Sequence, residues 1–320
     1  MKYNKLEYNS AIFLSSISLF LGIGINRVVS IAKNDSWISV IIGSILGLLF
    51  LYLFKKLKNK KRKWLSLLAN IIILSIDIFL ITKLISSIYL NKTPDFMVML
   101  PFLIIIYYGV KKGFSTILKV SSILFFVYIL ITIIPVATLV PSINYDYFKP
   151  ILNNSFINIL IGAIRFAIIS ISPIVIFPNF KENFNYKSYV FSCLLLLTII
   201  AGVIGNLGLD LSLLYRYPEY MVFKNISLMG FIENIQNILS YLWLISSFVI
   251  ALFTSYNVKN TLTNKGLIIV LISILFSFSF FLLNNYIYTD YLINYYSYIL
   301  LTPIILCIFT KIWQNNKCLL

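Results

Sequence analysis

The chain has 320 residues, of which 60% are hydrophobic and 11% are charged, and its mean hydropathy is +0.94. A soluble domain carries about 25% charged residues, so this composition excludes an ordinary soluble protein. Apolar runs near the roughly 20 residues needed to cross a bilayer recur along the chain and predict an all-α polytopic membrane protein. The net charge of +16 does not indicate a nucleic-acid partner, because the basic residues gather in alternate loops.

The composition gives little support for a catalytic site or a metal site. There is no histidine, and the three cysteines, Cys193, Cys307 and Cys318, lie in or beside apolar runs. We therefore expect no metal site, no disulfide framework and no cofactor. The N-terminal run follows Lys2 and Lys5 as in a signal peptide, but it has full spanning length and no small-x-small cleavage site, so we expect a retained first helix.

We expect one transmembrane domain over residues 1–320 with about ten spanning helices. The expected spans are 10–30, 36–54, 64–90, 97–110, 117–139, 156–178, 188–209, 231–257, 265–284 and 292–312.

Charge alternates between the loops that join these spans. One side, which includes the cluster 55–63 and both termini, holds 18 of the 26 basic residues and two acids. The other side holds six basic residues and seven acids. Because basic loops stay in the cytoplasm, we expect both termini to be cytoplasmic and the number of spans to be even.

The first span carries a predicted break at Gly22–Asn26, which reads Gly22-Ile23-Gly24-Ile25-Asn26. Two alternating glycines and an amide weaken a helix in the middle of an apolar segment. Such a break is tolerated in a bilayer where the freed backbone groups face protein or a wet cavity. A polar link, 32–36, follows, and Asp35 or Ser36 is expected to cap the second helix.

The sixth span repeats this feature, with a second predicted break at Ser170–Pro173. Pro173 lacks the N–H that its helix needs, and Ser170 and Ser172 offer hydroxyls to the freed groups. An ordinary proline kink is the alternative. Paired with the first break, however, it favours two inverted five-helix repeats, about 10–139 and 156–312, with broken helices 1 and 6 and a site between them. At that site Gly22, Gly24 and Gly162 permit close backbone approach, and half-helix N-termini favour a ligand carboxylate.

Two charges lie deep within predicted spans, Asp77 in the third and Arg165 in the sixth. A carboxylate at the bilayer centre costs about 2.5–3.5 kcal/mol on insertion scales, so it faces protein or water. In the functional interpretation Asp77 meets a cation or a ligand amine and Arg165 meets a carboxylate. In the structural interpretation they neutralise each other or other partners.

Two outer segments, 140–155 and 211–230, are longer than tight turns. The second is rich in aromatic residues, including Tyr215, Tyr217 and Tyr220. This density is typical of a helix that lies on the outer membrane surface. We favour membrane anchoring over the alternative, a lid on a cavity.

Four motifs in order resemble the spore germination permease family, the B subunit of germinant receptors. They are Ala32 to Ser39 (AKNDSWIS), Phe148 to Leu152 with Ile161 to Ala163, Pro173 to Pro178, and Gly230 to Trp243. The chain departs from the family where Ile169-Ser170-Ile171 replaces an acidic residue and where Asn234 replaces an arginine. These departures concern ligand identity and ion coupling.

The resemblance implies a leucine-transporter-like fold in the cell membrane or the spore inner membrane. It also implies a permease-like subunit that binds a small germinant, such as an amino acid, at the breaks and signals to A-type and C-type subunits. A genuine amino-acid transporter on the same scaffold is the alternative. An intramembrane enzyme of envelope polymers is a distant third, because we find no nucleophile elbow, metal motif or carboxylate pair.

Overall fold

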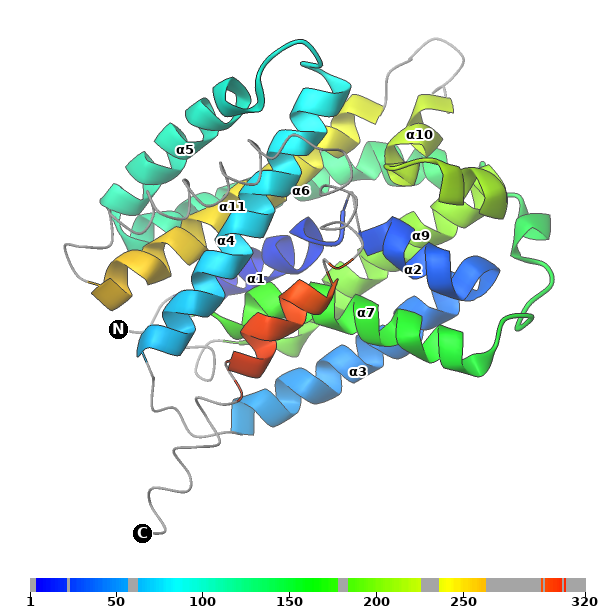
Figure 1. Cartoon of the computed structure of the whole chain (residues 1–320), viewed down its shortest axis with the longest axis horizontal. Helices are drawn as coiled ribbons and strands as arrows, with labels where there is room; N and C mark the ends of the chain where they lie inside the picture. Colours follow the sequence, from blue (N-terminus) through cyan, green and yellow to red (C-terminus); the bar gives the residue numbers. More distant parts are fainter. Residues whose placement is uncertain are drawn as a thin grey trace.

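A computed structural model describes residues 4–21, 24–56, 63–177, 184–225, 236–262, 295, 297–306 and 308. These residues form helices and turns without a strand, and the long helices lie side by side (Figure 1). The helices are α1 (Lys5–Ser18), α2 (Gly24–Ala32), α3 (Ser36–Lys56), α4 (Lys63–Ile88), α5 (Asp95–Lys112), α6 (Phe114–Leu139), α7 (Phe156–Val175), α9 (Tyr186–Leu214), α10 (Pro218–Asn225) and α11 (Gln236–Leu262).

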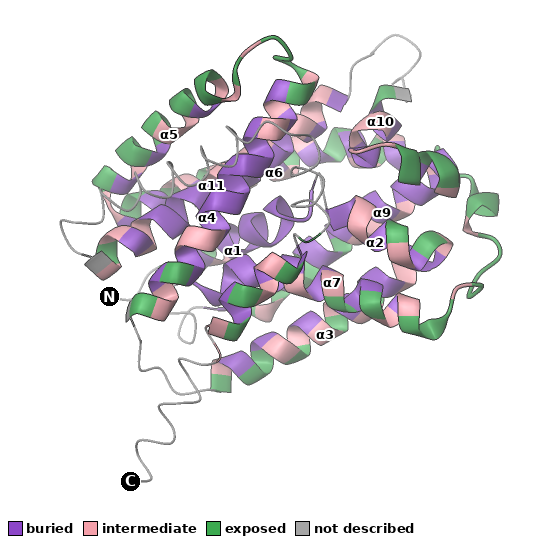
Figure 2. Ribbon diagram, in the orientation of Figure 1, coloured by how far each residue is buried: buried purple, intermediate pink, exposed green. Residues whose placement is uncertain are grey.

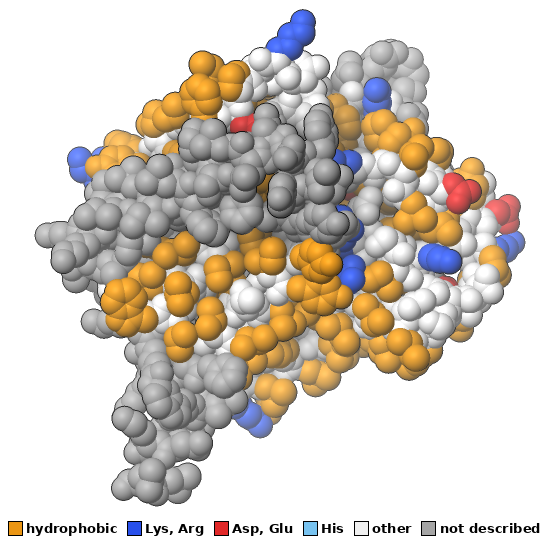
Figure 3. Space-filling view, in the orientation of Figure 1, with side chains coloured by type: hydrophobic (Ala, Val, Ile, Leu, Met, Phe, Trp, Pro, Cys, Tyr) orange, Lys and Arg blue, Asp and Glu red, His pale blue; other side chains and the backbone are white. Residues whose placement is uncertain are grey.

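The described residues contain six helices long and apolar enough to cross a membrane, and a shorter apolar helix, Ser297–Leu306. The all-α membrane class is therefore confirmed. The expected spans up to residue 257 match the helices within a few residues at most ends. The expected span 265–284 lies outside the described residues. Hydrophobic side chains cover much of the visible surface in Figure 3, as lipid contact requires.

The first span is broken as predicted, but a few residues earlier. The helix α1 ends at Ser18, and the Ile17 carbonyl accepts the backbone N–H groups of Phe20 and Leu21 at 3.0 and 3.1 Å. The Gly24 N–H then donates to the Phe20 carbonyl at 2.9 Å and restarts the helix. Gly24, Ile25 and Asn26 thus belong to the first turn of α2, while Gly22 and Ile23 lie outside the described residues.

The predicted break at Ser170–Pro173 is wrong. The helix α7 runs without interruption from Phe156 to Val175 and contains Pro173 in its last turn. Pro173 cannot donate to the Ile169 carbonyl four residues back, but the Ser172 hydroxyl donates to that carbonyl at 3.2 Å. A serine beside the proline therefore supplies the missing hydrogen bond, and the helix continues.

Small residues allow α3 to approach α7 and α9 closely. A Cβ on Gly43 would lie 2.5 Å from the backbone oxygen of Ala163, and a Cβ on Gly47 would clash with the Tyr189 hydroxyl. One turn earlier, the Ser39 hydroxyl donates to the Ile159 carbonyl of α7 at 2.9 Å. Glycines four residues apart and an interhelical serine are typical of tight packing between membrane helices. Figure 2 shows buried residues along this side of α3.

Hydrogen bonds join loops that the charge pattern assigns to the same side of the membrane. At one end of the molecule, Lys55 Nζ donates to the Phe184 carbonyl and Lys259 Nζ to the Val110 carbonyl. At the other end, the segment 140–155 and the residues joining α2 to α3 form a latch around Asp35.

The Asp35 latch replaces the predicted helix cap. The Asp35 carboxylate is 1% exposed and accepts the backbone N–H groups of Leu152 and Asn154 at 2.7 and 3.2 Å. The Asn154 amide donates in turn to the Ile31 carbonyl at 2.6 Å, near the end of α2. Asp35 therefore joins the first half of the chain to the segment before α7.

Candidate functional site

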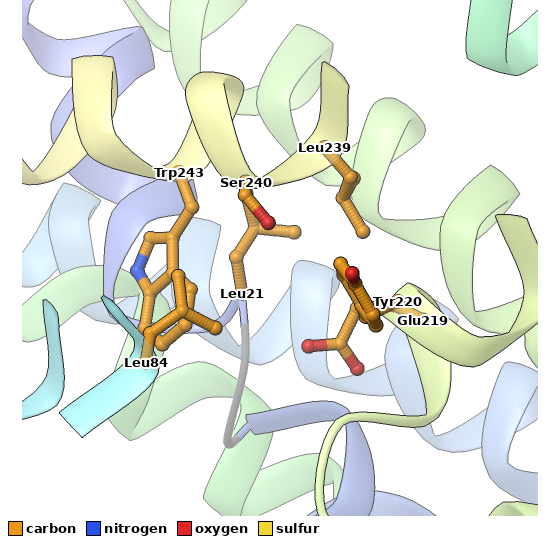
Figure 4. Close-up of a pocket in the computed structure, with 7 residues that line it drawn as sticks. All are labelled: Leu21, Leu84, Glu219, Tyr220, Leu239, Ser240 and Trp243. Carbon is orange, nitrogen blue, oxygen red and sulfur yellow. The ribbon is translucent and has the colours of Figure 1, made fainter. Parts of the chain in front are cut away.

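A small pocket opens beside the break in the first span (Figure 4). Its apolar walls come from three helices, with Leu21 just after α1, Leu84 on α4, and Leu239 and Trp243 on α11. Its polar groups are Ser240 on α11 and two residues of α10, Glu219 and Tyr220. The space in this conformation holds about one water molecule. A larger ligand therefore requires the walls to move apart.

The short helix α10 forms the cover of this pocket. Glu219, Val222 and Phe223 are 3%, 1% and 1% exposed, so most of the helix faces protein rather than lipid. The preceding Tyr217 lies 6.2 Å, ring to ring, from Trp243. Burial raises the pKa of the Tyr217 hydroxyl, which therefore stays protonated as a hydrogen-bond donor. The described part of the segment 211–230, up to residue 225, thus fits a lid better than the membrane anchor that the sequence favours.

The start of α2 is tied to the residues that lead into this cover. The Asn26 amide nitrogen donates to the Tyr215 carbonyl at 2.9 Å, across 189 positions of sequence. Asn26 was a candidate ligand residue, and here its amide joins the helix after the break to the link between α9 and α10. The first amides of α2 carry partial positive charge, and the Glu219 carboxylate lies on the nearby wall.

Asp77 lies beside the same break but in a separate environment. Its carboxylate is 1% exposed and accepts hydrogen bonds from the hydroxyls of Ser18, at 3.3 Å, and Ser247, at 2.9 Å. Ser18 is the last residue of α1, and Ser247 lies on α11. Among the described residues, no Lys or Arg nitrogen approaches Asp77 within 4.0 Å. The pairing of Asp77 with Arg165 that the sequence left open is therefore not formed.

Arg165 has an aromatic partner instead. Its Nη2 atom donates to the Tyr298 hydroxyl at 3.3 Å, and the guanidinium lies 5.4 Å from the centre of that ring. Tyr298 belongs to the helix Ser297–Leu306. This stacking fits a planar cation and an aromatic face, and it places Arg165 away from the pocket lining.

The remaining candidates on α7 make packing contacts. A Cβ on Gly162 would meet Ser39 and Ala32 at 2.9 and 3.2 Å, so this glycine permits the close approach of helices. The Ser170 hydroxyl lies 2.8 Å from the Tyr189 hydroxyl of α9. With Ser172 and Pro173 they build the interface of α7, and the pocket is lined by other residues. The described residues contain no group of three acidic or cysteine side chains that fits a metal ion.

Comparison with known proteins places the chain among germination proteins. The sequence profile of a family described as spore germination protein matches residues 8–289. Spore germination protein XB of Bacillus anthracis is 22% identical over 243 residues, which cover 68% of this chain and 68% of that protein. The matched range includes all seven residues that line the pocket.

Proposed function

This chain belongs to the spore germination protein family, and we propose that it is the permease-like subunit of a spore germinant receptor. It binds a small germinant within the membrane and passes the signal to A-type and C-type partner subunits. It resides in the spore inner membrane. The observation that supports the proposal is the small pocket with polar groups beside the broken first helix, because discontinuous helices are where permease folds hold their substrates.

The ligand that suits this pocket is a small zwitterion, such as an amino acid with an apolar side chain. The N-terminal amides of α2 favour a carboxylate. The buried Glu219 carboxylate favours an ammonium group, and Tyr220 and Trp243 beside it supply aromatic faces that attract cations. Leu21, Leu84 and Leu239 surround the apolar part. Since the pocket has room for about one water molecule, binding of an amino acid requires α10 to move. This movement supplies a conformational signal.

The substitution Glu219→Gln tests the ligand site. We expect it to raise the amino-acid concentration for half-maximal germination about tenfold or more, because a hydrogen bond to a charged group contributes about 1.5–3 kcal/mol. The measurement is a titration with a panel of L-amino acids, on spores in which this chain and its partners form the sole germinant receptor. Asp146→Asn, at an exposed outer carboxylate, is the control and should leave the titration unchanged. An unchanged response of Glu219→Gln at normal receptor level rejects the site.

A genuine amino-acid transporter is the second candidate, since the broken first helix also suits a carrier. Uptake of a labelled amino acid into proteoliposomes distinguishes the two. A receptor subunit binds the amino acid without accumulating it, whereas a carrier accumulates it along a gradient.

We also propose that the chain consists of two inverted halves. Three sets of helices at corresponding positions are in contact, α1 and α2 with α7, α3 with α9, and α4 with α11, and α3 packs most extensively on α7. A pseudo-twofold axis between the halves is compatible with the three corresponding pairings. The continuous α7 means that such symmetry does not extend to the break.

The orientation prediction is that both termini are cytoplasmic. In a variant without the three native cysteines, Lys56→Cys at the exposed end of α3 should resist an impermeant thiol reagent added to intact cells. Tyr147→Cys, in the segment 140–155, should react under the same conditions. The opposite labelling pattern contradicts the orientation, and permeabilised cells provide the positive control for both positions.

A further inference from the structure

The surroundings of Asp77 favour the neutral, protonated form of its side chain. Its two carboxylate oxygens each meet one serine hydroxyl, and the side chain is 1% exposed. An ionised carboxylate in an apolar interior is costly unless a cation or several donors compensate it. Ser15, one turn before Ser18 on the same face of α1, is buried and its hydroxyl has no hydrogen-bond partner in the described residues. A third hydroxyl nearby is thus not engaged by the carboxylate.

The charged groups of α1 and α11, and Lys83 of α4, lie away from Asp77 or are bound elsewhere in the described part of the chain. On α1 the charged residues are Lys5 and Glu7, at least 11 residues and about 16 Å from Ser18 along the helix. On α4 Lys83 is bound to Asp95 at 2.6 Å. On α11 Lys259 lies 12 residues and about 18 Å from Ser247 and donates to the Val110 carbonyl.

We propose that Asp77 is a proton-binding site, which holds a neutral carboxylic acid while α1, α4 and α11 are packed as in this structure. A carboxylic acid has one donor and one main acceptor, and a serine hydroxyl can act as either. In the neutral form the bond between Ser18 and Asp77 reverses, so that the acid O–H donates to Ser18 Oγ, while the Ser247 hydroxyl still donates to the other oxygen. The carboxyl group then makes both hydrogen bonds without a net charge. A metal cation would need more oxygen ligands than these two hydroxyls and one carboxylate supply.

Asp77 contacts the end of the first half of the broken helix, so it responds to movement there. Ser18 is the last residue of α1, and α2 begins at Gly24. A shift of this end removes one hydrogen bond from Asp77 and brings water to it, which favours loss of the proton. By linkage, alkaline pH then favours the shifted arrangement and acid pH favours the packed one. The inference is independent of the identity of the germinant.

Infrared spectroscopy of the purified chain in lipid nanodiscs tests the proposal. We expect the C=O stretching band of a protonated carboxylic acid at neutral pH, lost in Asp77→Asn and retained in the control Asp95→Asn. Asparagine reproduces the hydrogen bonds of the neutral acid, so Asp77→Asn should remain folded. Raising the pH should remove the band and lower the melting temperature of the wild-type chain together, while the melting temperature of Asp77→Asn should not follow that change.

Two results would overturn the proposal. One is the absence of the band at every pH at which the chain is folded. The other is a melting temperature of the wild-type chain, but not of Asp77→Asn, that falls when sodium chloride is replaced by choline chloride. The second result would assign the site to a sodium ion.

Discussion

Replacing Gly43 by leucine is expected to remove nearly all folded protein from the membrane. A Cβ at this position already lies 2.5 Å from the Ala163 backbone oxygen and 2.9 Å from the Phe166 ring. A backbone atom cannot turn aside as a side chain does, so α3 and α7 must separate. Overpacking of a well-packed interior typically costs about 1–3 kcal/mol, and leucine adds three carbons beyond the Cβ. Separation also breaks the bond from Ser39 to Ile159.

The measurement is the monodisperse fraction of a fluorescent fusion after mild detergent extraction. Ile45→Leu is the matched control, because Ile45 lies on the same helix with 55% of its surface exposed, in a position to face lipid. That control should extract normally. A Gly43→Leu variant with wild-type yield and melting temperature contradicts the close packing of α3 on α7.

Asp35→Ala should destabilise the chain by at least about 3 kcal/mol. The carboxylate accepts two backbone N–H groups and is almost fully buried. Each hydrogen bond to a charged group contributes about 1.5–3 kcal/mol, and its loss leaves a donor without an acceptor. The segment 140–155 loses two of its hydrogen bonds to the residues that join α2 to α3, so limited proteolysis there should accelerate together with the fall in melting temperature.

Two further variants test whether the lost stability comes from the hydrogen bonds of the Asp35 carboxylate. Asp35→Asn keeps one acceptor oxygen and should fall between wild type and alanine. Asp146→Asn removes an exposed carboxylate, which pairs with Lys149 at 2.8 Å with 76% of its side chain accessible, and should change little. Equal melting temperatures for Asp35→Ala and wild type would show that the latch contributes no stability.

The spans could be predicted from the sequence because hydropathy along the chain is a local property. The position of the first break was predicted only approximately. Glycine weakens a helix, but the Gly24 N–H donates to the Phe20 carbonyl. The interruption of the helix therefore lies before Gly24 rather than after it. The prediction of the second break was wrong for a comparable reason. Whether a hydroxyl rescues the carbonyl opposite Pro173 depends on the rotamer of Ser172, which the sequence does not determine.

The candidate site was predictable where burial of a charge identified it. Asp77 stands out in an apolar run, and the structure holds it beside the break. Glu219 and Trp243 did not stand out, because they belong to distant segments that meet only after folding. Gly162 and Ser170 were assigned to a ligand since small residues serve both sites and helix interfaces. Only the position of Ser39 and Tyr189 distinguishes the two uses.

The helix α2 is a rod of nine residues, about 13 Å long, fastened at both ends. Near its first turn Asn26 holds the link to α10, and near its last turn Ile31 and Asp35 hold the segment 140–155. We therefore expect a displacement of α10 to reach the segment 140–155 through α2, because hydrogen bonds join α2 to the link before α10 and to Asn154. Such a coupling needs no change in secondary structure.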